Sequence, residues 1–279
     1  MSEWNNRLGN PLQPGDYIDP ETGLHRCRVC NEYKETFFEI PGVPGSKKVV
    51  MCACKCTREQ DAARREALER QRTEYERTRR RTECFGGDTK KACCTFALDD
   101  QRDARLSRQV HGYVNAFESY RETGKGLLLL GPTGTGKTFY ACCIANAVID
   151  AGHSAIVTNF AEIANELQAT FDKGSVHKRL LRTDLLVLDD LAAERDTSFM
   201  QEIVFQVVEE RSAAQKPMIV TSNVSVQEFF APGDLARGRV FSRLAEACIP
   251  LSVAVTDRRL ERRKIEQHED QESLYMAGG

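Results

Sequence analysis

The clearest chemistry in this sequence lies in a glycine-rich loop, Gly-Pro-Thr-Gly-Thr-Gly-Lys-Thr, at residues 131–138. It matches the pattern G-x-x-x-x-G-K-[ST] in full and follows the apolar run 127–130, as a phosphate-binding loop requires. Backbone N–H groups of such a loop surround phosphate oxygens, Lys137 would reach the β- and γ-phosphates, and the Thr138 hydroxyl would ligate Mg²⁺. A glycine-rich turn without a ligand is the alternative. We predict nucleotide binding through Gly131, Pro132, Thr133, Gly134, Thr135, Gly136, Lys137 and Thr138.

A second motif, residues 184–190, joins an apolar run to two carboxylates: Asp-Leu-Leu-Val-Leu-Asp-Asp. Buried parallel strands are apolar on both faces, and open α/β sheets bind ligands at the carboxyl ends of their strands. We therefore read it as the Walker B strand. Asp189 is predicted to hold Mg²⁺, directly or through water, and Asp190 to orient and deprotonate the attacking water. The alternative is a strand followed by an acidic turn.

The apolar strand expected at residues 217–221 ends in the polar sequence Thr221-Ser-Asn223. A hydrogen-bonding side chain in this place would lie between the γ-phosphate and the catalytic water, which is the sensor-1 position of AAA+ ATPases. We predict this role for Asn223. Simple nucleotide kinases use an arginine-rich lid instead.

Arginines near the end of the chain are candidates for contacts with the γ-phosphate. An arginine projected from one subunit into the next would stabilise transition-state charge, and it would require self-association through the AAA+ interface. Arg243 is the first candidate for this finger and Arg239 the second, while Arg259 is predicted to act in cis as the sensor-2 arginine. Surface arginines without such a role are the alternative.

Helices and apolar strands alternate from residue 96 onward, which is typical of a parallel sheet. The predicted fold class is therefore α/β: an AAA+ P-loop NTPase with a five-stranded parallel sheet flanked by helices. Helices are expected at about residues 100–120, 137–151 and 198–214, with another before residue 170. The strands are expected at residues 126–130, 154–158, 184–189, 217–221 and 249–255.

Five of the eleven cysteines form two tight clusters near the N-terminus, and a turn-rich segment separates them. Two thiolate clusters joined by an insert of hairpin size can hold a structural Zn²⁺ in tetrahedral geometry, which would stabilise a module too small for its own core. A redox pair or plain buried thiols are the alternative, and the nearby His25 is a weaker candidate ligand. We predict a zinc site built from four of the five: Cys27, Cys30, Cys52, Cys54 and Cys56. The other six cysteines are expected to be small buried residues.

Residues 57–82 contain neither glycine nor proline and interleave arginine with glutamate, which predicts a solvated linker helix capped by Thr57. The arginines at positions 77 and 79–81 are candidates for phosphate contacts with nucleic acid, or are part of a plain linker. The predicted division is a zinc-binding module at residues 1–56, a linker at 57–83 and the ATPase domain at 84–279.

The composition, 41% hydrophobic and 29% charged with a net charge of −2, is that of a globular chain. We find no signal peptide and no apolar stretch approaching the roughly 20 residues of a membrane span. We therefore expect a cytoplasmic protein without membrane association, whose cysteines are reduced thiols or metal ligands.

These motifs together resemble the helicase-loader ATPases of the DnaC/DnaI type, including phage versions and the related IstB transposition ATPases. The resemblance covers about residues 84–262, and the cysteine clusters are similar to those of the DnaI-type and phage-type loaders. The sequence departs from many relatives in carrying Asp190 where they have glutamate, and Ala192-Ala193 where Gly-Ala is usual. The motifs that carry the resemblance are residues 126–138, 144–146, 188–194, 221–223 and 239–244.

The resemblance implies an ATP-dependent loader that delivers a replicative hexameric DNA helicase onto single-stranded DNA, with ATP, Mg²⁺ and Zn²⁺ bound. In this family the N-terminal module grips the helicase. The segment 160–182 is implied to meet single-stranded DNA, with Phe171 stacking on bases beside cationic residues, or else packing into the core. An IstB-like transposition ATPase that binds duplex target DNA is the main alternative function. Two further function classes stay open, a small-molecule kinase and a zinc adaptor with an inactive nucleotide site.

Overall fold

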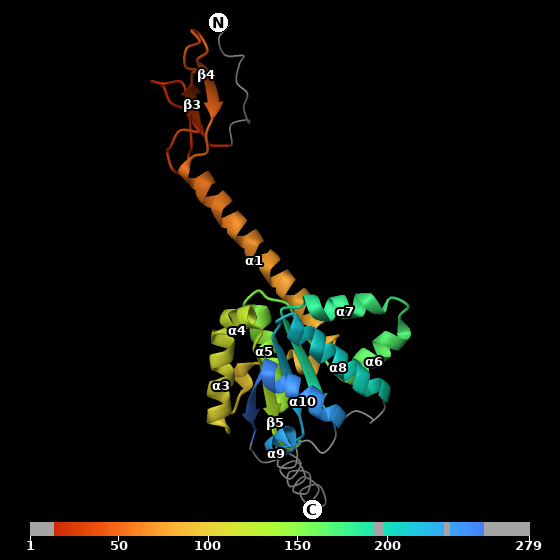
Figure 1. Cartoon of the computed structure of the whole chain (residues 1–279). Coiled ribbons are helices and arrows are strands. Elements are labelled where there is room, and N and C mark those ends of the chain that lie inside the picture. Colours follow the sequence, from red (N-terminus) through yellow and green to blue (C-terminus); the bar gives the residue numbers. More distant parts are fainter. Residues whose placement is uncertain (1–13, 192–197, 232–234, 254–279) are drawn as a thin grey trace, which may run out of the picture. The chain divides into compact units, whose positions relative to one another are not determined.

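Figure 1 shows the computed structural model of the chain, which describes residues 14–191, 198–231 and 235–253. The chain divides into two compact units, residues 1–75 and 76–279. Helix α1, Lys55–Phe85, contributes residues to both units. The boundary between the units thus falls inside the predicted linker helix, and the division at residues 56 and 83 stays a prediction.

The N-terminal unit contains two small antiparallel ribbons. Strand β1 (Tyr17–Ile18) pairs with β2 (His25–Arg26), and β3 (Glu35–Phe38) pairs with β4 (Lys48–Met51). The predicted linker helix is present and extends slightly beyond residues 57–82 at both ends. Gly86 and Gly87, both with positive φ, end it by leading the chain into a conformation that other residues rarely adopt.

The second unit alternates helices with strands, as predicted. The expected helix at residues 100–120 is instead two helices, because Ala116 leaves helical geometry between them, with ψ at 17°. No helix in the described part of the chain is long and apolar enough to span a membrane. Before the first strand lie α2 (Thr89–Ala92), a 3₁₀ helix (Phe96–Leu98), α3 (Ala104–Asn115) and α4 (Phe117–Thr123). Then follow β5 (Gly126–Leu130), α5 (Lys137–Asp150), β6 (Ala155–Thr158), α6 (Phe160–Ala169), α7 (Lys173–Arg182), β7 (Leu185–Leu191), α8 (Ser198–Ala213), β8 (Met218–Ser222), α9 (Val226–Phe230), α10 (Leu235–Ala247) and β9 (Cys248–Ser252).

The five strands β5 to β9 form one parallel sheet in the order β6-β7-β8-β5-β9, which confirms the predicted fold class. Strand β5, which leads into the phosphate-binding loop, pairs with β8 on one side and β9 on the other. Because all strands run in the same direction, their carboxyl ends meet at one edge of the sheet. This edge gathers the predicted nucleotide-binding motifs.

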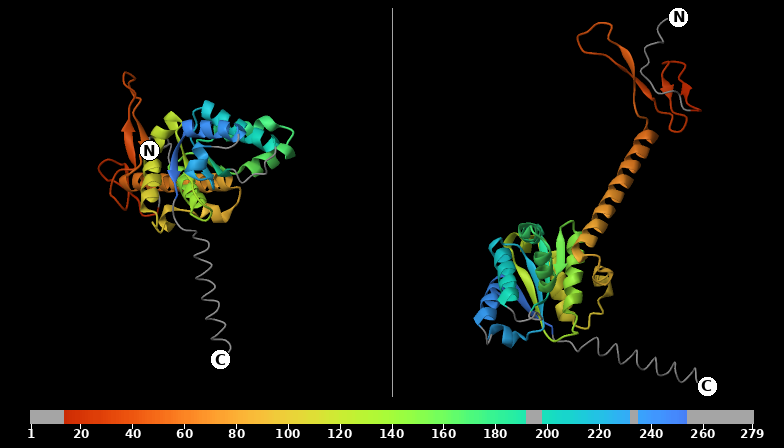
Figure 2. Two further views of the ribbon diagram at one scale, coloured as in Figure 1. Left: turned by 60° about the horizontal axis from the view of Figure 1, so that its bottom comes forward. Right: turned by 90° about the vertical axis from the view of Figure 1, so that its right-hand side faces the viewer.

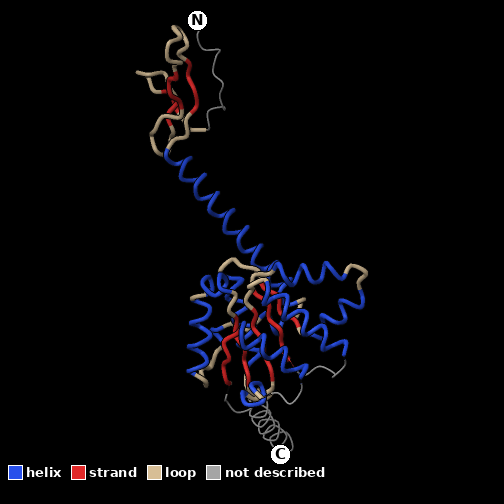
Figure 3. Tube along the Cα trace, in the orientation of Figure 1, coloured by secondary structure: helices blue, strands red, loops and turns tan. Residues whose placement is uncertain are grey.

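Helices cover both faces of this sheet, as Figures 2 and 3 show. One face packs against α3, α4, α5 and the end of α1, and the other against α6 to α10. All five residues of β5 are buried, because side chains that alternate along the strand face the two cores. The two-sided burial explains why β5 reads as a continuous apolar run in the sequence.

Four of the six cysteines outside the N-terminal clusters are buried, as expected: Cys84, Cys142, Cys143 and Cys248. Burial raises the pKa of both Cys84 and Cys248 to about 12, so these thiols stay protonated at neutral pH. The prediction was wrong for Cys93, which is exposed, and only partly right for Cys94, which is half-buried. Both follow the short α2, where the chain runs over the surface of α5.

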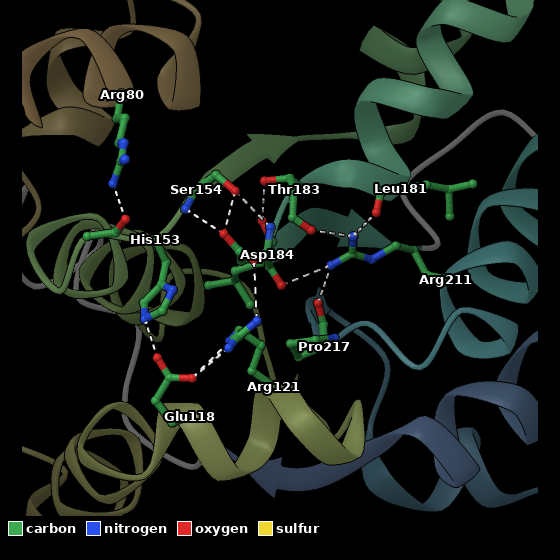
Figure 4. Close-up of polar contacts among 12 residues, drawn as sticks. Arg80, Glu118, Arg121, His153, Ser154, Leu181, Thr183, Asp184, Arg211 and Pro217 are labelled. Atoms are coloured by element: carbon green, nitrogen blue, oxygen red, sulfur yellow. Dashed lines mark hydrogen bonds and ion pairs between the residues drawn. The ribbon is translucent and has the colours of Figure 1, made fainter. Parts of the chain in front are cut away.

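Arg211 on α8 is the largest fully buried side chain of the described residues, with 1% of its surface exposed. Figure 4 shows its guanidinium aimed at the backbone that follows α7. It donates to the carbonyl oxygens of Leu180 at 2.9 Å, Thr183 at 2.8 Å and Pro217 at 2.6 Å. Burial lowers the pKa of Arg211 to about 10, which still leaves the side chain charged at neutral pH. The residue thus satisfies carbonyls at the end of α7 and before β8 that have no partner within their own elements.

We expect Arg211→Met to lower the free energy of unfolding by about 2–4 kcal/mol, because several buried carbonyls would lose their donor. Urea unfolding of the full chain followed by circular dichroism measures this change. Arg105→Met on the exposed face of α3 is the matched control, with an expected change within about 0.5 kcal/mol. Equal stability of the two variants would contradict a structural role for Arg211.

Candidate functional site

The loop between β5 and α5 has the conformation that its glycines permit. Gly131, Gly134 and Gly136 have φ values of 153°, 80° and 97°, which other residues rarely adopt. At Gly131, a Cβ atom would also lie 2.2 Å from the carbonyl oxygen of Val253, so only glycine fits there. The loop leads directly into α5, whose N-terminal N–H groups suit an anion.

Lys137 joins the loop to the predicted catalytic residues. Its ammonium donates to the carbonyl oxygens of Gly131 at 2.8 Å and Pro132 at 2.7 Å, and to Asn223 Oδ1 at 2.8 Å. The amide of Asn223 in turn donates through Nδ2 to Asp190 Oδ1 at 2.7 Å. The structure therefore brings Lys137, Asn223 and Asp190 into one hydrogen-bonded chain.

Asp189 forms the centre of a second chain. Its Oδ1 accepts hydrogen bonds from the hydroxyls of Thr138 at 2.8 Å and Thr221 at 2.7 Å. The Asp189 carboxylate is mostly buried, with 12% of the side chain exposed, so these donors offset part of its desolvation. A carboxylate beside a threonine hydroxyl offers the hard oxygen ligands that Mg²⁺ prefers.

Asp190 takes an unusual backbone conformation, with φ at 66°. The pairing of β7 with β8 shifts register between Leu188 and Leu191, and Asp190 lies within this irregularity. Its backbone N–H donates to Thr221 Oγ1 at 2.8 Å, and its side chain is exposed while Asp189 is buried. The bulge thus separates the two adjacent carboxylates, one held among buried hydroxyls and one facing solvent beside Asn223.

Sequence reasoning missed two residues of this site. Thr221 contacts both carboxylate-bearing residues, and the only signal for it was its place at the end of an apolar strand. The Lys91 ammonium lies 4.0 Å from Asp189 Oδ2, although Lys91 precedes the phosphate-binding loop by forty residues and belongs to no recognised motif. A short helix that returns to the sheet edge brings it there.

The predicted arginines are not part of this hydrogen-bonded set. Arg243 lies on α10 and forms ion pairs with Glu209 at 2.7 Å and Glu246 at 3.4 Å, with 46% of its side chain exposed. Arg239 lies exposed one turn earlier on the same helix. Arg259 falls outside the described residues. Roles for all three stay predictions.

The N-terminal cysteines form one compact cluster. The sulfur atoms of Cys27, Cys30, Cys54 and Cys56 all lie within 4.8 Å of one another. Four sulfurs bound at about 2.3 Å to one tetrahedral ion lie about 3.8 Å apart, so the cluster fits Zn²⁺. Backbone hydrogen bonds from Cys56 and Glu32 lower the pKa of Cys30, which favours the thiolate that a metal needs.

The fifth cysteine, Cys52, is not part of this cluster. Its thiol donates to the carbonyl oxygen of Tyr33 at 3.3 Å, and burial raises its pKa. His25 instead lies 3.4 Å from Glu35 and likewise stands outside the four-sulfur cluster. The geometry therefore separates four ligand candidates from the spare thiol, which the spacing alone did not do.

The segment predicted to meet DNA forms α6, α7 and the turn between them. Phe171 in this turn is fully exposed, so the alternative that it packs into the core is wrong. Behind α7, a cavity of about 530 Å³ is lined by the cationic side chains of Arg80, Lys178, Arg179 and Arg182, among other residues. Arg179 pairs with Glu166, and Arg80 donates to the carbonyl oxygen of Gly152. The segment thus presents an exposed aromatic ring in the turn before α7 and basic side chains on α7 itself.

The arginines at the end of α1 mainly anchor this helix. Arg77 donates to the carbonyl oxygen of Asp150, and Arg81 pairs with the side chain of Asp150 and donates to Asn146 Oδ1 at 3.2 Å. Carbonyls at the C-terminus of α5 attract cations through the helix dipole. These contacts explain Arg77 and Arg81 without nucleic acid.

The chain is similar in sequence to known helicase-loader proteins. The chain is 30% identical to the replicative helicase loader DnaI of Bacillus subtilis over 158 residues, which are 54% of this chain and 49% of that protein. It is 26% identical to the replicative helicase loader DnaC of Escherichia coli over 132 residues, which are 43% of this chain and 54% of that protein. The chain thus spans about half the length of these curated relatives.

A crystal structure of DnaI shows the same fold. It aligns with 64% of this chain and 99% of that chain at 21% identity, with a TM-score of 0.54. The family model described as IstB-like ATP binding protein matches residues 64–264, which include the phosphate-binding loop and both carboxylates and exclude the cysteine cluster. The chain therefore carries the nucleotide site of a P-loop ATPase and belongs to the family of IstB-like ATP binding proteins.

Proposed function

We propose that this protein is an ATP-dependent loader of a replicative hexameric DNA helicase onto single-stranded DNA. The hydrogen-bonded chain Lys137–Asn223–Asp190, beside the Thr138–Asp189 pair, is the observation that carries the ATPase part of the proposal. Similarity to two proteins named replicative helicase loaders supports the remainder.

In this proposal, each residue of the site has a separate role in ATP binding or hydrolysis. The loop N–H groups and Lys137 bind and orient the triphosphate. Thr138 and Asp189 would hold Mg²⁺, which would neutralise charge on the phosphates when bound. Asp190 accepts a proton from the attacking water, and Asn223 orients that water because it already contacts both Asp190 and Lys137.

The N-terminal unit is the proposed helicase-binding module. Four thiolates would hold Zn²⁺ and close a fold that has little core of its own. Apolar side chains that are about half exposed gather on the β3–β4 ribbon and its loop: Phe37, Phe38, Ile40 and Val43. Exposed apolar groups of this kind are typical of surfaces that bind another protein.

Single-stranded DNA is the proposed ligand of α6, α7 and their connecting turn. Phe171 is exposed for stacking on a base, and Lys178 and Arg182 are available to attract phosphates. An IstB-like transposition ATPase that binds duplex target DNA is the second candidate function, because the matching family model is described as IstB-like ATP binding protein. The preferred form of DNA distinguishes the two functions.

We expect Cys27→Ser to release about one Zn²⁺ per chain and to abolish binding to the replicative helicase of the same cell, because a small metal module unfolds without its ion. Elemental analysis and co-purification of the full chain with the helicase measure the two effects. Cys52→Ser is the matched control and should retain both zinc and helicase. Zinc-free wild-type protein, purified without chelator, would contradict the metal assignment.

We expect Phe171→Ala to weaken binding to single-stranded DNA roughly 5- to 150-fold, because one stacked base contributes about 1–3 kcal/mol. Fluorescence anisotropy with labelled oligonucleotides measures the affinity in the presence of ATP. Tyr75→Ala removes another exposed aromatic ring, on α1, and should leave the affinity unchanged. Tighter binding of the wild type to duplex than to single strands would favour the transposition ATPase instead.

We expect Arg243→Ala to bind ATP normally but to lose stimulated hydrolysis, because a finger acts only on the transition state in a neighbouring subunit. Mixing it with Asp190→Asn should restore partial activity, since an interface can then pair an intact finger with an intact base. A phosphate-release assay over a range of protein concentrations measures both effects.

Arg239→Ala is the comparison variant for this experiment. Loss of hydrolysis in Arg239→Ala, with normal rates in Arg243→Ala, would assign the finger to Arg239. Rates that do not depend on protein concentration, together with no rescue on mixing, would contradict a shared site between subunits.

A further inference from the structure

Lys91 stands at the metal-binding side of the candidate nucleotide site. Its ammonium lies 4.0 Å from Asp189 Oδ2, while Asp189 Oδ1 is occupied by Thr138 and Thr221. The two carboxylate oxygens therefore have different surroundings, hydroxyl donors on one and a cation beside the other. Three quarters of the Lys91 side chain is buried, with 24% exposed.

The backbone around Lys91 is fixed by two polar side chains. Asp88 caps α2 by accepting from the N–H groups of Lys90 at 3.0 Å and Lys91 at 3.1 Å. Asn146 donates through Nδ2 to the carbonyl oxygens of Ala92 at 3.2 Å and Cys94 at 2.8 Å. Because Asn146 is buried in α5, the helix that follows the phosphate-binding loop, these bonds hold the end of α2 in a defined position against α5.

Lys91 also balances the charge of the side chains in the site. Asp189 and Asp190 carry two negative charges, and Lys137 supplies only one positive charge among the residues already assigned. Lys91 brings these four side chains to neutrality, so together with the Mg²⁺ that Thr138 and Asp189 would hold, the site would carry the positive charge that attracts the phosphates of ATP. Thr138 and Asp189 are also the candidate Mg²⁺ ligands, so the Lys91 ammonium lies on the side where the terminal phosphates are held.

We propose that Lys91 is a second ammonium of the nucleotide site, positioned by Asn146, that pairs with Asp189 and attracts the terminal phosphates of ATP. This inference rests on the proposed nucleotide-binding function and adds a binding residue to it. The role differs from that of Lys137, because Lys91 comes from outside the loop and approaches from the carboxylate side. Its contribution is therefore larger for ATP, with its extra phosphate, than for ADP.

The test is the affinity of the full chain for MgATP and MgADP, measured by isothermal titration calorimetry at two salt concentrations. Lys91→Met should weaken MgATP binding roughly 5- to 20-fold, with a smaller loss for MgADP and a smaller loss at high salt. Lys91→Arg should retain most of the affinity, and Asn146→Ala should lose part of it. Lys90→Met is the matched control: the neighbouring lysine is exposed and should have no effect on either nucleotide.

Two results would overturn the proposal. The first is wild-type MgATP affinity in Lys91→Met. The second is an equal, salt-independent loss for both nucleotides together with a lower melting temperature, which would mean that Lys91 only stabilises α2. Lys137→Ala separates this outcome from failure of the proposed function: if Lys137→Ala also binds MgATP normally, the nucleotide site itself is wrongly assigned.

Discussion

The buried carboxylate of Asp189 is the group on which the arrangement of the nucleotide site depends. It accepts hydrogen bonds from Thr138, at the start of α5, and from Thr221, at the end of β8, while Asp189 itself belongs to β7. Three segments of the chain therefore meet at one oxygen atom. A carboxylate this deeply buried requires donors, so the same bonds that make its burial tolerable also hold the loop helix and the two strands in register.

Thr221 connects Asp189, the proposed Mg²⁺ ligand, to Asp190, the proposed base for the attacking water. Its hydroxyl donates to Asp189 and accepts from the backbone N–H of Asp190, which lies in the bulge of β7. The bulge directs Asp190 toward Asn223 and away from the hydroxyls around Asp189. Two carboxylates adjacent in sequence thus reach different environments, which allows one to suit a metal and the other a water molecule.

Much of this arrangement was predictable because parallel strands impose it. Each strand buried on both faces reads as an apolar run with its polar end at the common carboxyl edge, and Asp189 and Asn223 were predicted in this way. Lys137 was predicted instead from the glycine-rich motif that follows β5. The register shift beside Asp190 leaves no signal in the sequence, since it depends on the pairing of β7 with β8. Lys91 reaches the site through tertiary contacts of a four-residue helix, which no periodicity reveals. Spacing likewise could not choose among five thiols, because ligand selection depends on where the sulfur atoms meet in space, and Cys52 bonds instead to the carbonyl of Tyr33.

The two units differ in what stabilises them. The ATPase unit has two apolar cores on either side of its sheet, whereas the strands of the N-terminal unit are two to four residues long and leave several aromatic and aliphatic side chains exposed. So little secondary structure buries too little apolar surface to balance the loss of chain entropy. A metal held by four thiolates would supply the missing stability while leaving the apolar residues of the β3–β4 ribbon free to bind another protein. In the proposed module, a bound metal would therefore take the place of an apolar core, so that the apolar side chains of the ribbon would not have to be buried to stabilise the fold.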